Sequence, residues 1–217
     1  MSGPQASDVS VLIAAADTDA RPGPDPAVLP LEGRPVVDWV ADKARQLGAQ
    51  VLVACAPGMQ APGGTVAVPG GATRHQTVQR LAERADRPWS LLWDADSPLA
   101  SRALARRVLA AALHTGAATP CLPGDAPWYV LEQGRIVRTH PGAFAAASQT
   151  PLACATLLLQ AAGAQARREG WEAQDAVQLL LRTGHAVATV PGEKLNIALA
   201  TPDDWLLAAA LRERLSR

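Results

Sequence analysis

The chain has 217 residues, of which 48% are hydrophobic and 18% are charged, with 20 basic and 20 acidic side chains. This length and balance predict a single soluble domain, residues 1–217, with a buried core. The formal net charge of zero excludes electrostatic attraction to nucleic acid or to an anionic membrane as the main activity, and no apolar run approaches the roughly 18 residues that a membrane helix needs.

The first residues and the cysteines favour a cytoplasmic protein. Residues 1–10 have neither the basic start nor the apolar core of a signal peptide. The cysteines are odd in number and far apart, at Cys55, Cys121 and Cys154, and this spacing matches no metal-ligand pattern. We expect them to be buried thiols.

Short apolar runs without polar alternation predict the strands. They are Val9–Ala15, Val51–Ala56, Ser90–Trp93, Ala118–Leu122 and Ala186–Val190. Continuous runs of this length are typical of strands that are covered on both faces, and therefore of a parallel sheet.

Helical patterns lie between and after these runs. They are Pro35–Leu47, Arg74–Ala85, Ser101–His114, Pro151–Glu169, Asp175–Thr183 and Thr201–Leu215. The last begins with Thr-Pro-Asp-Asp, which supplies an N-cap, a proline at the first helical position and acids in the first turn. The alternation predicts an α/β fold, a three-layer α/β/α doubly wound domain with a mostly parallel sheet, whose ligands bind at the carboxyl ends of the strands.

Residues 123–150 interrupt the alternation of strands and helices. They contain the only tyrosine and the only phenylalanine of the chain, and a hairpin-like stretch, YVLEQGRIVRT, at 129–139. We predict a protruding β-arm here.

Seven segments in chain order resemble the 2-C-methyl-D-erythritol 4-phosphate cytidylyltransferases of non-mevalonate isoprenoid synthesis, which have a nucleotide-diphospho-sugar transferase-like fold. The segments are VLIAAA (11–16), LPLEGRPVVDW (29–39), VPGGATRHQTV (68–78), LLWDADSPL (91–99), GRIVRT (134–139), SQTPL (148–152) and VPGEKLNIALATPDDW (190–205). The resemblance implies transfer of a cytidylyl group from CTP to methylerythritol phosphate with release of pyrophosphate. It also implies a Mg²⁺ or Mn²⁺ ion and a homodimer that forms through the arm.

The resemblance also implies where the ligands bind. The nucleotide-binding positions are Ala14, Ala15, Ala16, Gly70, Gly71, Arg74 and Thr77. Asp94 corresponds to the metal-binding aspartate, and Asp96 is either a second metal ligand or the cap of the following helix. His75 is expected to be an exposed helix residue.

The positions that contact phosphate in the family are mostly changed in this chain. The two glycines of its phosphate-binding loop correspond to Ala16 and Thr18, the loop arginine to Ala20, and its two lysines to Ala27 and Ala198. Anionic phosphates need cations and backbone N–H groups in the transition state. We therefore expect a catalytically impaired or inactive homologue.

The remaining charges leave alternatives open. Asp17, Asp19 and Asp25 would repel a triphosphate, since two unit charges about 5 Å apart interact by roughly 3 kcal/mol at an effective dielectric near 20. Arg21 and Lys194 are weak candidates for the missing catalytic cations. The alternatives are an active nucleotidyltransferase with a rearranged site and a different substrate, and a glycosyltransferase that uses the Asp-Ala-Asp at 94–96.

Overall fold

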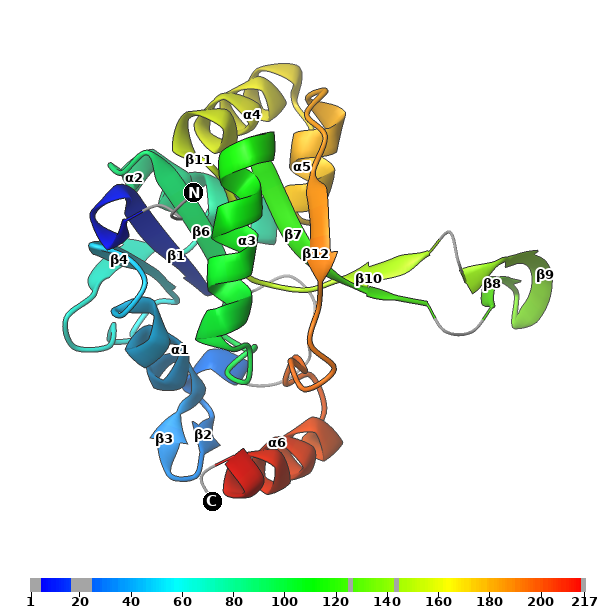
Figure 1. Ribbon diagram of the computed structural model, residues 1–217, viewed down its shortest axis with the longest axis horizontal. Coiled ribbons are helices and arrows are strands. Elements are labelled where there is room, and N and C mark those ends of the chain that lie inside the picture. The colour runs from blue at the N-terminus through cyan, green and yellow to red at the C-terminus, as the bar shows by residue number, and fades with distance from the viewer. Residues whose placement is uncertain (1–4, 17–24, 125–126, 143–144, 216–217) are drawn as a thin grey trace.

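The computed structural model describes residues 5–16, 25–124, 127–142 and 145–215. In this part of the chain a central sheet of eight strands lies between two layers of helices, and a thin β-hairpin extends away from this body (Figure 1). The predicted α/β fold with a mostly parallel central sheet is confirmed.

The strands and helices agree with most of the predicted ranges to within about two residues. The strands are β1 (Val9–Ala15), β2 (Pro30–Leu31), β3 (Arg34–Pro35), β4 (Gln50–Cys55), β5 (Val66–Pro69), β6 (Trp89–Asp94), β7 (Ala117–Pro123), β8 (Trp128–Glu132), β9 (Arg135–His140), β10 (Ala146–Ser148), β11 (Leu152–Ala155) and β12 (Ala188–Pro191). The helices are α1 (Val36–Ala44), α2 (Arg74–Arg84), α3 (Arg102–Thr115), α4 (Thr156–Glu169), α5 (Ala176–Arg182) and α6 (Pro202–Leu215), with short 3₁₀ turns at Ala6–Asp8 and Pro26–Val28.

The sheet has the strand order β10-β7-β11-β6-β1-β4-β5, with β12 also paired to β7. Strand β1 is parallel to β4 and β6, and β4 is parallel to β5. The prediction that a helix begins at Pro151 is wrong, because Leu152–Ala155 forms β11, antiparallel to both β6 and β7. Three of its residues are buried, so this apolar run fills the middle of the sheet before α4 begins.

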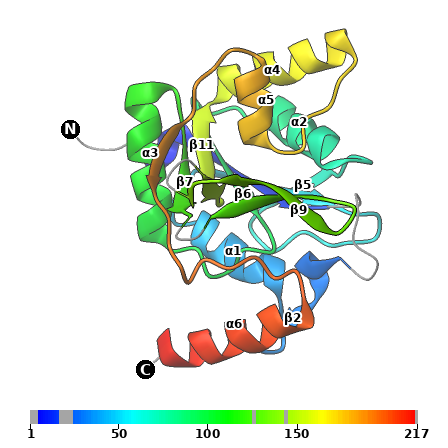
Figure 2. The ribbon, with the colours of Figure 1, turned by 90° about the vertical axis from the view of Figure 1, so that its right-hand side faces the viewer.

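The core lies on both faces of the sheet. All seven residues of β1 are buried, as the continuous apolar run predicts. Alternate side chains point to opposite faces, so Val11 and Ile13 pack with α1 and α3, whereas Leu12 and Ala14 pack with α2, α4 and α5. Figure 2 shows these two groups of helices on either side of the sheet.

The predicted hairpin is formed by β8 and β9, which pair only with each other (Figure 1). Large apolar side chains of these strands are exposed to solvent, at Trp128, Tyr129, Leu131, Ile136 and Val137. Isolated two-stranded hairpins are marginally stable in water, so this arm presents an apolar surface that nothing in the described chain covers.

The C-terminal helix α6 begins as its sequence predicts. The Asp204 carboxylate accepts hydrogen bonds from the backbone N–H of Ala200 and from the N–H and hydroxyl of Thr201, at 2.7 to 3.0 Å. Helix α6 packs against the β2–β3 hairpin, where Trp205 donates to the carbonyl of Pro30. In the described residues no helix is long and apolar enough to cross a membrane.

Candidate functional site

Three strand ends and one helix start meet at one edge of the sheet. The carbonyl of Ala14 accepts from the backbone N–H of Ala95, and Ala14 is in register with Asp94 on β6. The buried Thr77 hydroxyl accepts from Gly71 N at 3.0 Å and donates to Ala16 O at 3.1 Å. The structure thus brings together the sequence-predicted residues of the first strand, the glycine turn and the metal-binding position.

The glycine turn allows backbone segments to approach closely. A Cβ on Gly70 would lie 2.3 Å from the Ala16 Cβ, and one on Gly71 would lie 2.4 Å from the Gln76 Cβ and 2.7 Å from Thr77 N. Real Cβ atoms do not approach so closely, because packing at these distances is strongly repulsive. The two glycines are therefore required by the fold, whatever they also bind.

The first residue of α2 is paired with the last residue of β6. Thr73 caps α2, its hydroxyl accepting from Gln76 N at 3.2 Å. This places the Arg74 guanidinium against the Asp94 carboxylate, where the two form an ion pair with side chains that are 17% and 25% exposed. A partly buried pair is screened less by solvent than a surface one, so Arg74 is the principal charge that Asp94 meets here.

A cavity of about 320 Å³ opens beside this ion pair. Its wall comes from the ends of β6 and β7, the β10–β11 connection, the start of α5, and Asn196 and Ala198 of the closing segment. Among the described residues the lining has one guanidinium, Arg74, and two carboxylates, Asp94 and Asp175. The Asp175 carboxylate also caps α5, accepting from Gln178 N at 2.7 Å. The described lining is therefore richer in negative than in positive charge.

The second aspartate of the Asp-Ala-Asp segment has a different position. The Asp96 carboxylate accepts from the Ser97 hydroxyl at 3.2 Å, and the Asp96 carbonyl accepts from Leu199 N. Helix α3 is capped by Ser101, whose hydroxyl accepts from Leu104 N at 2.9 Å, so the interpretation that Asp96 caps this helix is wrong. The cavity lining includes Asp94 but not Asp96.

A metal ion at this edge would need ligands in addition to the described side chains. Among the described residues no three His, Cys, Asp or Glu side chains lie together as a metal site. Mg²⁺ is commonly held by one or two carboxylates together with substrate phosphates and water. Asp94 fits that pattern only if a bound nucleotide supplies the other oxygens.

The closing segment turns before it reaches the cavity. Asn196 N donates to Glu193 O at 2.9 Å. Lys194 is exposed and does not line the cavity, whereas Ala198 does. Arg21 and the aspartates at 17 and 19 lie outside the described residues.

Two residues that position the site were missed by sequence reasoning. The Gln149 amide donates to the carbonyls of Glu193 and Asn196, and its oxygen accepts from Glu193 N, so it fixes the closing segment to the cavity wall. The Lys43 ammonium donates to the carbonyls of Pro98 and Ala100, in the loop that follows Asp94. Lys43 falls on the apolar stripe of α1, seven residues after Val36, and a charged residue on such a stripe is a signal that could have found it.

Burial, together with the nearby Arg212 and Arg102 and against the opposing effect of Glu193, lowers the pKa of Lys43 from its ordinary value of 10.5 to about 8. The unfolded chain therefore holds this proton at pH values where the folded chain has released it. Between pH 8 and pH 10.5 we expect the free energy of unfolding to rise relative to that of Lys43→Met by about 2–3 kcal/mol. Urea denaturation at a series of pH values measures this difference.

Lys43→Arg is the matched control, since a guanidinium does not titrate below pH ~12. The difference in unfolding free energy between the Arg and Met variants should stay constant over the same pH range. If the difference in unfolding free energy between wild type and Lys43→Met did not change with pH, the prediction would be contradicted.

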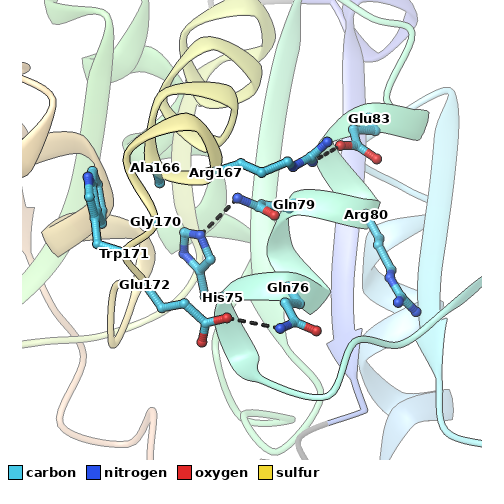
Figure 3. A pocket seen from close by; sticks show the side chains of 10 residues that line it. All are labelled: His75, Gln76, Gln79, Arg80, Glu83, Ala166, Arg167, Gly170, Trp171 and Glu172. Atoms are coloured by element: carbon cyan, nitrogen blue, oxygen red, sulfur yellow. Dashed lines mark hydrogen bonds and ion pairs between the residues drawn. The ribbon is translucent and has the colours of Figure 1, made fainter.

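A second and larger cavity, of about 540 Å³, lies between α2 and the end of α4 (Figure 3). Three of its charged side chains have partners in the lining, since Arg167 pairs with Glu83 and Glu172 accepts from Gln76. A fourth, Arg80, donates to the carbonyl of Gly70. The prediction that His75 is exposed is wrong, because the ring is 5% exposed and its Nδ1 accepts from Ala173 N. Burial also lowers the pKa of His75. The groove lies away from the strand ends, so we assign the functional site to the smaller cavity.

Comparisons with known proteins point to one family. The family of 2-C-methyl-D-erythritol 4-phosphate cytidylyltransferase matches residues 9–214. A protein of that name from Thermus thermophilus is 42% identical over 94% of this chain and 97% of its own length. Another, from Deinococcus radiodurans, is 33% identical over 97% of this chain and 93% of its own length.

Solved structures agree with the sequence matches. The crystal structure of a Thermus thermophilus protein of the same name superposes with a TM-score of 0.83 at 38% identity, covering 93% of this chain and 98% of that one. A 4-diphosphocytidyl-2C-methyl-D-erythritol synthase from Anaerococcus prevotii has a TM-score of 0.81 at 18% identity, covering 96% of this chain and 100% of that one. The second similarity supports the fold alone.

Proposed function

The chain belongs to the 2-C-methyl-D-erythritol 4-phosphate cytidylyltransferase family, and from this membership we propose that it binds CTP with Mg²⁺ or Mn²⁺ but transfers the cytidylyl group poorly to 2-C-methyl-D-erythritol 4-phosphate. In the family reaction, a phosphate oxygen of the acceptor attacks the α-phosphorus of CTP and pyrophosphate leaves. We assign nucleotide binding to the residues predicted above, the end of β1 and the glycine turn with Arg74 and Thr77, and metal binding to Asp94.

Nucleotide binding is supported by the position of the glycine turn. Gly70 and Gly71 follow the carboxyl end of β5, which is parallel to β4, and β4 is parallel to β1. Ligands of doubly wound folds bind at such strand ends. The Thr77 hydroxyl holds this turn against Ala16. The Ala16 and Gln76 side chains fill the space beside the two glycines, so the support for nucleotide binding is the place of this turn at the strand ends.

Impaired transfer is supported by the charge of the cavity lining. The one guanidinium of the described lining, Arg74, is already paired with Asp94. The resemblance aligns Ala198 with a lysine of the family. The transition state brings two anions together and needs cations that neutralise them. Each preorganised donor that is lost lowers kcat by about 10²–10³. The Arg74–Asp94 ion pair is the observation that carries this proposal.

The experiment is a pyrophosphate-release assay with CTP, 2-C-methyl-D-erythritol 4-phosphate and Mg²⁺. The Thermus thermophilus relative provides the control reaction under the same conditions. We expect turnover to be lower than that of the relative by at least about 10³, while CTP with Mg²⁺ still raises the melting temperature. Turnover equal to that of the relative would overturn the proposal that transfer is impaired.

A second candidate function is an active nucleotidyltransferase with a different acceptor. It is favoured by the cavity itself, which remains open beside Asp94 and is lined by hydroxyl and amide side chains. Thermal shift against the four ribonucleoside triphosphates, each with Mg²⁺ or Mn²⁺, tests it. Stabilisation by a nucleotide other than CTP, abolished by Asp94→Ala, favours this candidate, and no shift with any nucleotide counts against it.

We also propose that the protein forms a homodimer through the β8–β9 arm. The exposed Leu131 and Ile136 are cross-strand partners, so they present one apolar patch. Burying one large aliphatic side chain contributes about 1.5–3 kcal/mol. Ile136→Glu is therefore expected to weaken the dimer by at least about tenfold, measured by sedimentation equilibrium. Glu132→Gln is the control on the same hairpin, and a monomeric wild type would contradict the proposal.

A further inference from the structure

We propose that Asn196 is a specificity-determining residue for the acceptor, because its side-chain oxygen accepts a hydrogen bond from a hydroxyl of the molecule bound beside Asp94. The inference rests on the proposed function in taking this cavity as the acceptor site. It adds to that site a residue of the closing segment, which neither the strand ends nor the glycine turn supplies.

The side-chain oxygen of Asn196 is buried and lacks a donor. Asn196 is 6% exposed and lines the cavity that also contains Asp94. Among the described residues nothing donates a hydrogen bond to its Oδ1 atom. Such atoms are rare in folded proteins, because a buried polar atom without a partner costs free energy. A ligand hydroxyl in the cavity would remove that cost.

The other polar atoms of Asn196 determine which end of the amide is left over. Its Nδ2 donates to the Thr150 carbonyl at 2.8 Å, and its backbone carbonyl accepts from the Gln149 amide at 2.8 Å. If the side-chain amide were reversed, its oxygen would face the Thr150 carbonyl oxygen, and neither atom can donate. The group that remains is therefore an acceptor, and it selects a ligand that carries a donor.

Asn196 is also linked to the position of Asp94. Thr150 connects the two residues, since its carbonyl accepts from Asn196 and its hydroxyl accepts from the backbone N–H of Asp94 at 3.4 Å. The χ2 torsion of asparagine has a broad energy minimum, so a small rotation turns Oδ1 toward a ligand while Nδ2 keeps its bond to Thr150. An acceptor that lies beside Asp94 is thus in reach of this oxygen.

The experiment compares 2-C-methyl-D-erythritol 4-phosphate with the three analogues that lack one hydroxyl, at C1, C2 or C3. NMR chemical-shift titration measures their binding to the full-length protein, with and without CMP, a nucleotide that has no pyrophosphate to release. In the wild type we expect one analogue to bind about 10- to 100-fold more weakly than the parent compound. Asn196→Ala should reduce this difference to less than about twofold.

Two further variants separate the oxygen from the path of the closing segment. Asn196→Asp keeps an acceptor oxygen at the same place, so the difference between parent and analogue should persist. Gln149→Met is the matched control, because it removes the hydrogen bonds of Gln149 to Glu193 and Asn196 and leaves the Asn196 side chain intact. It should weaken all four ligands by the same factor and preserve the difference.

Four results would overturn the inference. They are an equal loss of affinity for all four ligands in Asn196→Ala, loss of the difference in Gln149→Met as well, equal binding of all four ligands to the wild type, and no binding of the parent compound with or without CMP. The last two need no variant to fold. Failure of CTP to bind would overturn the nucleotide part of the proposed function, whereas the titrations without CMP would still decide the role of Asn196.

Discussion

Gly70→Ala is expected to lower the free energy of unfolding by about 2–3 kcal/mol, although it adds a single methyl group. The new Cβ would lie 2.3 Å from the Ala16 Cβ and 3.2 Å from the Cys55 carbonyl oxygen. The same carbonyl accepts from Gly70 N at 2.9 Å, so the turn cannot move away without losing that hydrogen bond. Urea denaturation of wild type and variant measures the difference.

A double-mutant cycle shows whether the contact between the new Cβ and Ala16 causes this loss of stability. Ala16→Gly removes the atom that clashes, so the Gly70→Ala/Ala16→Gly protein should recover more than about 1 kcal/mol of the loss. Gly63→Ala is the matched control, because a Cβ there would meet no atom within 4 Å, and its effect should stay within about 0.5 kcal/mol. If the effects of Gly70→Ala and Ala16→Gly on the unfolding free energy were strictly additive, the contact between these two positions would not be the cause of the loss.

The predictions that succeeded from sequence alone were those governed by local patterns. The continuous apolar run of β1 was found because burial on both faces leaves no polar residue to interrupt it. The start of α6 was found because its capping residues lie within four positions of each other. The β8–β9 hairpin was found because its strands flank a short turn. In each case the pattern that identifies the element lies within one short stretch of sequence, although β1 itself pairs with β4 and β6 far along the chain.

The predictions that failed depended on partners far away in the sequence. Leu152–Ala155 has helical neighbours, and only its pairing with β6 and β7 makes it a strand. His75 was predicted to be an exposed helix residue, because its hydrogen-bond partner, the backbone N–H of Ala173, lies 98 positions later in the chain. Lys43 was not recognised as a residue that positions the site, because the carbonyls that accept from its ammonium lie 55 and 57 residues away. Packing that joins distant segments overrides local preference.

The same distinction between local patterns and distant partners holds for the residues of the candidate site. The strand-end position of Asp94 followed from the apolar run before it, and the resemblance supplied the glycine turn. That Arg74 would pair with Asp94 could not be predicted, because the two residues belong to different elements 20 positions apart. The ion pair changes the chemistry of the site, since the carboxylate that would hold a metal ion already has a cationic partner.

Asp94→Asn is therefore expected to abolish the metal-dependent part of nucleotide binding. In the wild type, CTP at about 100 times its Kd should stabilise the folded state by about 2.7 kcal/mol when Mg²⁺ is present. A carboxamide is a much weaker Mg²⁺ ligand than a carboxylate. The shift in melting temperature with CTP should thus depend on Mg²⁺ in the wild type and become independent of it in the variant.

The Arg74 partner provides the control for this measurement. Arg74→Met removes a residue that we assign to nucleotide binding and leaves the Asp94 carboxylate in place. The shift with CTP should therefore become smaller, while its dependence on Mg²⁺ persists. Its own cost to folding, about 1–3 kcal/mol from the partly buried carboxylate left without its ion pair, is measured by urea denaturation without ligand. Mg²⁺ dependence that survives in Asp94→Asn would instead assign the metal to oxygens of the nucleotide and of other residues, and the ion pair would then be a structural contact between α2 and β6.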